Sequence, residues 1–369
     1  MNFSILICIF GQMNKEIYNV IGVMSGTSLD GVDLAHICFK IKENKWSFDI
    51  QECETISYSE NWVQSLKLAV DYSEEKLTQL NLDYTKLLAS IISEFIHKNK
   101  IENLDAVCSH GHTILHQPQN GFTLQIGNLP EIVKLIGQTI VCDFRVQDVK
   151  LGGQGAPLVP IGDRILFSDY DYCLNLGGFS NISFEENGKR IAFDISPVNT
   201  VLNFYANKLG FDFDDKGKIS KSGKIDDELL NELNTLEYYQ KSFPKSLGFE
   251  SVKQIILPLI EKYDIAVEDK MRTFTEHIAF QIGESLDYKK GKLLITGGGA
   301  YNDFLIHRIQ ENLSQIEIII PDPKTLEYKE ALIFALLGIL KLRNEINVLS
   351  SVTGAKHDHS SGEIFHNEQ

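Results

Sequence analysis

Apolar runs joined by glycine-rich turns form the most regular pattern in this chain. The first such unit spans residues 18–39 and opens with a predicted strand at residues 18–24. The second unit spans residues 172–184 and turns at Gly177-Gly178. β-rich runs separated by residues that tolerate positive φ angles predict hairpins. Because the unit occurs twice, we expect two structurally related halves.

Segments with helical periodicity lie between these units and after them. Apolar residues at three- and four-residue spacing predict amphipathic helices. The predicted helices span residues 85–98, 226–240, 251–263, 272–288, 304–313 and 326–343. Strand units alternating with helices predict an α/β fold with mixed sheets.

Charge and composition narrow the possible functions. The chain has 369 residues, with 35 Lys and Arg against 50 Asp and Glu, and a formal net charge of −15. This length suits roughly two domains, and a 43% share of hydrophobic residues is ordinary for a globular protein. Without a basic stripe the chain is poorly suited to neutralise a phosphate polymer, so we expect no nucleic-acid partner.

Cysteine usage and the N-terminal apolar run bear on the cellular compartment. The six cysteines are scattered, without a C-x-x-C pair, which is typical of reduced thiols. The apolar run at residues 3–10 is far shorter than a membrane span, and no basic residue precedes it. We therefore predict a cytoplasmic protein that contacts no membrane, with its translation start at Met13 rather than a signal peptide.

The first glycine-rich segment runs from Gly22 to Gly31 and follows a strand, as phosphate loops do. It lacks the lysine of a Walker A motif. It offers backbone N–H groups, serine and threonine hydroxyls, and the carboxylates of Asp30 and Asp33, which suit polyphosphate and Mg²⁺. An ordinary hairpin is the alternative interpretation. The hydroxyl-bearing residues of this segment are Ser25, Thr27 and Ser28.

Two further glycine segments add to this pattern. Gly177-Gly178 is placed to clamp phosphates from the opposite side. Residues 293–302 combine a buried strand, a triple glycine beginning at Gly297 and the start of a helix. A close backbone approach at such a turn suits the flat face of a nucleotide or its α-phosphate. Tight turns without a ligand remain the alternative.

In this order, the three segments resemble the actin/hexokinase-type ATPase architecture. Strings along nearly the whole chain, from residue 21 to residue 355, are also similar to motifs of the anhydro-N-acetylmuramic acid kinase family. These strings are Gly22-Val-Met-Ser-Gly-Thr-Ser-Leu-Asp-Gly-Val-Asp33, Ser109-His-Gly-His-Thr113, Thr123-Leu-Gln-Ile-Gly-Asn128, Asp143-Phe-Arg145, Gly152-Gly-Gln-Gly-Ala-Pro-Leu-Val-Pro160, Leu174-Asn-Leu-Gly-Gly178, Lys245-Ser-Leu-Gly248, Gly297-Gly-Gly-Ala-Tyr-Asn302 and Val352-Thr-Gly-Ala355.

The resemblance implies two ribonuclease H-like domains with mixed sheets flanked by helices and a nucleotide cleft between them. We expect residues 1–142 and 327–369 to form the first domain and residues 143–326 the second. The implied cofactors are ATP and Mg²⁺, and we expect a homodimer. The implied ATP-binding residues are Gly26, Thr27, Ser28, Leu29, Asp30, Gly31, Val32, Asp33, Gly177, Gly178, Gly297 and Gly298.

The resemblance also implies a reaction. Such an enzyme uses ATP and water to open the 1,6-anhydro ring of anhydro-N-acetylmuramic acid, giving N-acetylmuramate 6-phosphate. The family's base lies in a D-T-G-P-G-N string, which corresponds here to Asp194-Ile-Ser-Pro-Val-Asn199. Asp194 is therefore the expected base for the attacking water. Without the resemblance, Asp194 is equally well interpreted as a helix N-cap.

The expected contacts to the sugar come from four residues. His112 stands where the family usually has Gln, and Arg145 suits bidentate pairing with the lactyl carboxylate. Asp148 and Glu330 complete the set. The alternative for Arg145 is a structural ion pair with an aspartate. The alternative for Glu330 is that it only favours the N-terminus of the last helix. The H-x-H-x₃-H spacing at His110 suggests zinc only weakly, because no Cys, Asp or Glu completes a close ligand set.

Two other functions remain open at this point. A hexokinase-like kinase transfers phosphate to a free sugar hydroxyl, and its base then activates the sugar rather than water. A nucleotide-dependent switch uses the same architecture without catalysis, although a carboxylate at Asp194 disfavours it.

Overall fold

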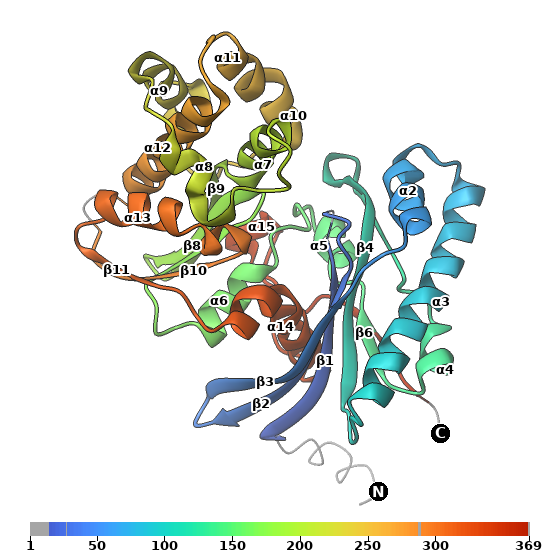
Figure 1. Ribbon diagram of the computed structural model, residues 1–369. Coiled ribbons are helices and arrows are strands. Elements are labelled where there is room, and N and C mark those ends of the chain that lie inside the picture. Colours follow the sequence, from blue (N-terminus) through green and yellow to red (C-terminus); the bar gives the residue numbers. More distant parts are fainter. Residues whose placement is uncertain (1–14, 27, 287–288, 368–369) are drawn as a thin grey trace, which may run out of the picture. The chain divides into compact units, whose positions relative to one another are not determined.

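The structure is a computed structural model that describes residues 15–26, 28–286 and 289–367 (Figure 1). The apolar run at residues 3–10 and Met13 lie outside these residues. The chain forms two compact units. Unit 1 comprises Met1–Leu166 and Tyr328–Gln369, and unit 2 comprises Phe167–Glu327.

Unit 1 is built on a mixed sheet in the order β12-β6-β4-β1-β2-β3, with β5 paired to β4. The strands β1, β2 and β3 pair antiparallel with one another, as do β5 with β4 and β12 with β6, whereas β4 runs parallel to β1 and to β6. The strands are β1 (Ile17–Ser25), β2 (Val32–Lys42), β3 (Lys45–Ile56), β4 (Ala106–Gln117), β5 (Phe122–Ile126), β6 (Ile140–Cys142) and β12 (Glu363–Phe365).

Helices cover both faces of this sheet (Figure 1). Side chains alternate between the faces of a strand, and in β1 Ile21 and Val23 join a buried cluster with α3, whereas Gly22 lies against α14. The helices of unit 1 are α2 (Glu60–Leu68), α3 (Glu74–Lys98), α4 (Ile132–Ile136), α5 (Val146–Lys150), α6 (Val159–Leu166), α14 (Pro323–Leu342) and α15 (Ser350–Thr353), with 3₁₀ turns at Ala69–Asp71 and Pro118–Asn120. α14 is kinked at Tyr328, where unit 1 resumes.

The contact between α14 and the sheet is unusually close. A Cβ at Gly22 would lie 2.0 Å from the carbonyl oxygen of Ala331, and one at Gly338 would lie 2.1 Å from Sγ of Cys108. Real Cβ atoms do not approach other atoms so closely, so these two positions require glycine. The backbones of β1 and α14 are therefore in direct contact.

Unit 2 repeats the strand order of unit 1. Its sheet runs β11-β10-β7-β8-β9, with β7, β8 and β9 antiparallel and β10 parallel to both β7 and β11. The strands are β7 (Tyr172–Leu176), β8 (Phe179–Glu186), β9 (Lys189–Pro197), β10 (Gly291–Thr296) and β11 (Ile316–Ile319). The expectation of two ribonuclease H-like units with mixed sheets flanked by helices is confirmed.

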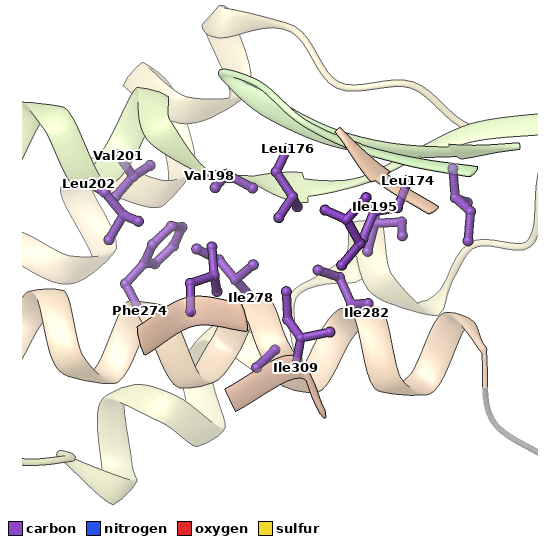
Figure 2. Packing of buried hydrophobic residues seen from close by; sticks show 14 of the residues in the cluster. Leu174, Leu176, Ile195, Val198, Val201, Leu202, Phe274, Ile278, Ile282 and Ile309 are labelled. Atoms are coloured by element: carbon purple, nitrogen blue, oxygen red, sulfur yellow. The ribbon is translucent and has the colours of Figure 1, made fainter. Parts of the chain in front are cut away.

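The core of unit 2 lies between its sheet and its helices (Figure 2). Alternate residues such as Leu174 and Leu176 of β7 face Phe274, Ile278 and Ile282 of α12 (Figure 2). The helices of unit 2 are α7 (Asn199–Lys208), α8 (Lys218–Ser222), α9 (Asp227–Asn234), α10 (Phe249–Ser251), α11 (Leu257–Glu261), α12 (Val267–Ser285) and α13 (Asp303–Asn312), with 3₁₀ turns at Asp215–Gly217, Glu237–Gln240 and Gly298–Tyr301 and a π-helical turn at Val252–Ile256.

The helices differ from their predicted bounds where local chemistry overrides the apolar pattern. α3 begins at Glu74 rather than at residue 85, because Ser73 caps its first turn. The predicted helix at residues 251–263 contains a π-helical turn directly before Pro258, which has no N–H to donate. Among the described residues, no helix is long and apolar enough to cross a membrane.

The first boundary between the units also differs from the expected one. The sequence placed residues 143–166 in the second domain, whereas the structure keeps them in unit 1. Two contacts explain this. Asp148 of α5 accepts a hydrogen bond from Thr353, and Asp163 of α6 forms a 2.7 Å ion pair with Lys329 of α14. Both tie this segment to the C-terminal part of the chain.

We predict that Gly338→Ala lowers the melting temperature. The added methyl group meets Cys108, and overpacking of this kind typically destabilises a core by about 1–3 kcal/mol, although alanine favours the helix by about 1 kcal/mol. The control is Gly298→Ala, because no atom lies within 4 Å of a Cβ at that position. Thermal unfolding followed by circular dichroism tests this, and equal melting temperatures for the two variants would contradict the close contact.

Candidate active site

The first glycine hairpin connects β1 to β2. Met24 pairs with Asp33 at the last rung of the ladder, and the turn closes with a 3.3 Å hydrogen bond from the N–H of Leu29 to the carbonyl of Gly26. Leu29 has a φ of 61°, in the left-handed region. Ser28 donates a 2.7 Å hydrogen bond to Asp30. Thr27 lies outside the described residues.

The glycines at the two ends of this turn differ in their surroundings. A Cβ at Gly31 would lie 2.4 Å from the carbonyl oxygen of Ile56, so Gly31 is required by packing. At Gly26 the nearest atom to a Cβ is Oγ of Ser28, at 3.4 Å. The space beside Gly26 is therefore free for another molecule, whereas Gly31 and Val32 are buried.

Carboxylates gather near this hairpin in unit 1. Asp33 accepts a 2.6 Å hydrogen bond from Thr55. Glu330 of α14 is exposed, but the protein around its carboxylate removes enough water to raise its pKa. Arg145 opposes this increase, and the negative charges of Asp33 and Asp30 add to it. The cluster therefore repels further anions unless a cation joins it.

Arg145 lies among the residues expected to contact the sugar. Its Nε donates a 2.8 Å hydrogen bond to Nε2 of His110, and one terminal nitrogen donates a 2.6 Å hydrogen bond to the carbonyl of Gly155. Desolvation lowers its pKa to about 10, and the charges of Glu330 and Asp148 oppose that decrease. The guanidinium therefore keeps its positive charge at neutral pH, with donors left over for a ligand.

Asp148 is fully buried and holds the loop that follows α5. One carboxylate oxygen accepts a 2.7 Å hydrogen bond from the N–H of Gly155, and the other accepts one of 2.7 Å from Thr353. A Cβ at Gly153 would lie 2.2 Å from the same carboxylate. Because both oxygens are engaged inside the protein, the geometry favours a structural role for Asp148 over the expected sugar contact.

The three histidines of the H-x-H-x₃-H spacing are engaged separately. His110 contacts Arg145, His112 lies 2.8 Å from Oγ of Ser25, and His116 lies 3.0 Å from Oγ1 of Thr123. Within the described part of the chain, no group of three or more His, Cys, Asp or Glu residues has a geometry that could hold a metal ion.

The second glycine hairpin, in unit 2, connects β7 to β8 and is fastened to the start of α7. The carbonyl of Gly178 accepts hydrogen bonds from the N–H groups of Val198 and Thr200, at 2.8 and 3.2 Å, and the carbonyl of Gly177 accepts one of 3.3 Å from Asn199. These carbonyls occupy the first N–H groups of α7, so the exposed Gly178 is fastened to the start of that helix.

Asp194 lies on β9, just before this hairpin's contact with α7. A carboxylate oxygen accepts a 2.8 Å hydrogen bond from the N–H of Leu247, and its carbonyl accepts one of 2.6 Å from Tyr238. The N-cap of α7 is Val198, so Asp194 caps no helix there. Burial raises the pKa of Asp194, and the Leu247 hydrogen bond partly offsets this increase.

The backbone of β9 is irregular at this point. Ser180 pairs with Ser196, and Asn181 pairs with Asp194, so Ile195 is an extra residue in the ladder. This bulge turns the strand locally. The side chain of Ile195 is buried in the core, which leaves Asp194 half-buried on the other face.

Tyr238 and Leu247 were not anticipated from the sequence. The only signal was the Lys245-Ser-Leu-Gly string, to which no role was assigned. The N–H of Asp194 donates a 3.2 Å hydrogen bond to the carbonyl of Lys245 in this string. The Lys245 ammonium lies over the rings of Phe193 and Tyr238, at 5.8 and 4.8 Å from their centroids.

The third glycine segment borders a cavity of 580 Å³ within unit 2. Gly298 and Gly299 line the cavity, whereas Gly297 does not. A Cβ at Gly297 would lie 2.8 Å from the carbonyl oxygen of Leu176, so this glycine serves the packing of β10 on β7. The remaining lining residues are Asn199, Leu202, Asn203, Phe213, Asp214, Asp215, Lys216, Tyr301, Asn302 and Asp303.

These features define a class of protein: a pair of ribonuclease H-like α/β units, each with a glycine hairpin between its first two strands. The model of the family "Anhydro-N-acetylmuramic acid kinase" matches residues 18–367, and the chain belongs to this family. The matched region covers both hairpins, Asp194 and the C-terminal residues.

Curated relatives agree with this assignment over nearly their whole length. A protein from Mannheimia succiniciproducens named anhydro-N-acetylmuramic acid kinase is 35% identical over 96% of this chain and 100% of its own. One of the same name from Caldanaerobacter subterraneus subsp. tengcongensis is 32% identical over 95% of this chain and 98% of its own. Among solved structures, component A of the Acidaminococcus fermentans (R)-2-hydroxyglutaryl-CoA dehydratase is 16% identical, covers 88% of this chain and 99% of its own, and has a TM-score of 0.41, too low to bear on function.

We predict that Asp143→Asn stabilises the protein at pH 8 but not at pH 4. Burial, followed by the charge of Glu363, raises the pKa of Asp143 to about 6, against about 3.9 when unfolded. At pH 4 the folded carboxyl is protonated and the unfolded one is about half ionised, so the penalty is nearly absent there. As pH rises through this window, the folded state must ionise a half-buried carboxyl, which costs about 2–3 kcal/mol.

Asn suits the φ of 57° at position 143. Thermal unfolding at both pH values, with Asp169→Asn as the exposed control, measures the effect. A difference between Asp143→Asn and wild type that is the same at pH 4 and pH 8 would contradict the raised pKa.

Proposed function

We propose that this protein is an ATP-dependent kinase that hydrolyses the 1,6-anhydro ring of anhydro-N-acetylmuramic acid and phosphorylates O6. The product is N-acetylmuramate 6-phosphate, an intermediate of cell-wall recycling. The observation that carries the proposal is the family match over residues 18–367, joined by relatives of that name along the whole chain. We further propose that the protein acts in the cytoplasm as a homodimer.

The proposed nucleotide contacts follow from the local geometry. In unit 1 the hairpin from Gly26 to Asp33 offers its turn to phosphate, because the space beside Gly26 is open. In unit 2, Gly177 and the exposed Gly178 offer a turn that is fastened to the start of α7. The cavity beside Gly298 is lined by apolar and polar side chains, a combination that suits a nucleoside.

Mg²⁺ fits the residues near the first hairpin. Asp33 and Asp30 lie close enough to Glu330 to add to the rise in its pKa, and a divalent cation relieves such repulsion. Mg²⁺ bound to a nucleotide takes one or two carboxylates, with phosphate oxygens and water as its other ligands, so it needs no preformed group of three protein ligands. When bound, it neutralises charge on the phosphates. We propose Asp30 and Asp33 as its protein ligands.

The proposed reaction has one proton to remove. Water forms a bond to C1 while the C1–O6 bond breaks, and O6 forms a bond to the γ-phosphorus as ADP leaves. Asp194 accepts the proton of the water. Its raised pKa strengthens it as a base, while the N–H of Leu247 keeps it ionised and fixes its orientation. The Tyr238 hydrogen bond holds the backbone at the same residue.

Of the four residues expected near the sugar, we propose that three contact it directly and that one positions another. Arg145 retains donors for the lactyl carboxylate, and Glu330 and His112 complete the contacts. Asp148 acts as a positioning residue, because it holds the carbonyl of Gly155 that Arg145 binds.

An ¹⁸O-water experiment tests the reaction type. Turnover in labelled water places ¹⁸O at C1 if the ring is opened by hydrolysis. A kinase that transfers phosphate to a free hydroxyl incorporates no label, and that outcome would replace our proposal. Failure of the anhydro sugar to stimulate ADP release would favour a non-catalytic switch.

We predict that Asp194→Asn lowers kcat by about 10²–10⁴, the usual contribution of a general base. The amide is nearly isosteric, so ATP and the anhydro sugar should still bind. Calorimetry with each ligand and a coupled ADP assay measure the two effects, with Asp264→Asn as the exposed control. Activity within about threefold of wild type, far from the loss expected for a base, would rule out this role.

We predict that Gly26→Val abolishes ATP binding without unfolding the protein. Apart from its chain neighbours, a Cβ at this position has only Ser28 within 4 Å among the described residues, so the new side chain fills the space beside the turn. Gly31→Val is the contrasting variant, because its side chain collides with the backbone of Ile56 and should lower the melting temperature. Calorimetric titration and thermal unfolding distinguish the two. Normal ATP affinity in Gly26→Val would refute the hairpin's role.

A further inference from the structure

A line of hydrogen bonds in unit 1 leads from the hydrophobic core to the first glycine hairpin. The hydroxyls of Tyr84 and Tyr58 are 2.6 Å apart, and Tyr58 lies 2.6 Å from Oγ of Ser25. Oγ of Ser25 lies 2.8 Å from Nδ1 of His112. The four side chains come from α3, from the segment after β3, from the end of β1 and from β4.

The inner end of this line is rigidly held. Tyr84 has no exposed surface, and its ring packs against Trp62 at 5.7 Å between centroids. A Cβ at Gly127 would lie 2.9 Å from the same ring. Burial raises the pKa of Tyr84 well above its ordinary range, so the hydroxyl keeps its proton.

The position of Tyr84 sets the direction of the line. Within the described part of the chain, Tyr58 is the one group at hydrogen-bonding geometry from its hydroxyl, at 2.6 Å, although Ser25 lies near enough to oppose the rise in the pKa of Tyr84. A buried hydroxyl proton that is not donated costs free energy, so Tyr84 donates to Tyr58. The Tyr58 oxygen is then the acceptor, and its own proton goes to Ser25. Ser25 in turn donates to Nδ1 of His112.

This direction determines which nitrogen of His112 carries hydrogen. Burial lowers the pKa of His112 to about 4, so the ring is neutral at pH 7. A neutral imidazole has one N–H, and the nitrogen that accepts a hydrogen bond is the one without it. With Nδ1 accepting from Ser25, the hydrogen is on Nε2, which donates to no described residue.

We propose that the line from Tyr84 through Tyr58 and Ser25 fixes His112 as an Nε2–H donor for an acceptor oxygen of the sugar. The proposal rests on the proposed function for the identity of the ligand, but not for the state of the ring. His112 is then a binding group and not a base, because its unprotonated nitrogen is occupied. Tyr58 and Ser25 are positioning residues that act through it.

The state of the ring is measured directly by NMR. The full-length protein, labelled with ¹⁵N-histidine and free of ligand, contains ten histidines, and His112 is assigned by the signal lost in His112→Gln. We expect long-range ¹H–¹⁵N correlations of the Nε2–H tautomer at pH 7. An Nδ1–H tautomer, or a doubly protonated ring, would overturn the proposal.

Tyr58→Phe tests the role of the relay in the same experiment. Without the Tyr58 proton, Ser25 is free to accept from His112 as well as to donate to it. We expect the Nδ1 resonance to move toward the protonated value. Tyr172→Phe removes the hydroxyl of a buried tyrosine in unit 2 and should leave His112 unchanged. An unchanged Nδ1 resonance in Tyr58→Phe would remove Tyr58 from the line.

Kinetics test the donor role. In His112→Asn the amide replaces the Nδ1 side of the ring and nothing replaces Nε2, so KM for the anhydro sugar should rise about three- to tenfold, as for one lost hydrogen bond. In His112→Gln the amide nitrogen replaces Nε2, and the rise should be smaller. KM for ATP and kcat should stay within about twofold, as for a contact made equally in ground and transition states.

The failure of this proposal is distinguishable from failure of the proposed function. Equal sugar KM values for His112→Asn and wild type would overturn the donor role while turnover itself continues. Absence of any turnover by the wild-type protein would overturn the proposed function, and the NMR result would still support or refute the assigned tautomer.

Discussion

Direct contact between the backbones of β1 and α14 is the constraint on which unit 1 depends. At Gly22 the strand has no side chain, so the helix lies against the sheet with the Ala331 carbonyl in the place of a Cβ. This contact joins the first strand of the chain to residues more than 300 positions later. It also sets Glu330, the residue before Ala331, close to the hairpin that follows β1, and Lys329 against Asp163. The position of Glu330 beside the acidic hairpin thus follows from one missing side chain.

Buried and half-buried carboxylates divide into two kinds in this protein. Asp148 has protein donors on both oxygens and no exposed surface, an arrangement that fixes a loop. Among the described residues, the Asp194 carboxylate accepts one hydrogen bond, from the N–H of Leu247, and Asp194 remains half-buried. A carboxylate with a free oxygen is able to take a proton, whereas one that is fully engaged loses hydrogen bonds on protonation. Hydrogen bonding therefore separates the proposed base from the proposed positioning residue.

The sequence predicted the fold better than it predicted the details of the site. The two hairpins and the longest helices, α3, α12 and α14, were predictable because alternation and helical periodicity are local properties. The first domain boundary was misplaced because the contacts of Asp148 and Asp163 are made with residues some 200 and 170 positions away. Tyr238 and Leu247 contact Asp194 from a separate segment of the chain, and the spacing of residues in the sequence does not predict such contacts. Gly297 and Gly298 look alike in sequence, yet only Gly298 lines the cavity.

The interrupted path of unit 1 has a consequence for the order of folding during synthesis. β1 is among the first described residues to leave the ribosome, but Ala331 emerges after all of unit 2. At about 5–20 residues per second, this delay is about 15–60 s, far longer than a small domain needs to fold. Unit 2, whose residues are contiguous, can be complete while the sheet of unit 1 still has one face uncovered. During that interval the apolar residues of β4 that α14 later covers are exposed to chaperones and to self-association, a vulnerability of nascent chains that the finished fold conceals.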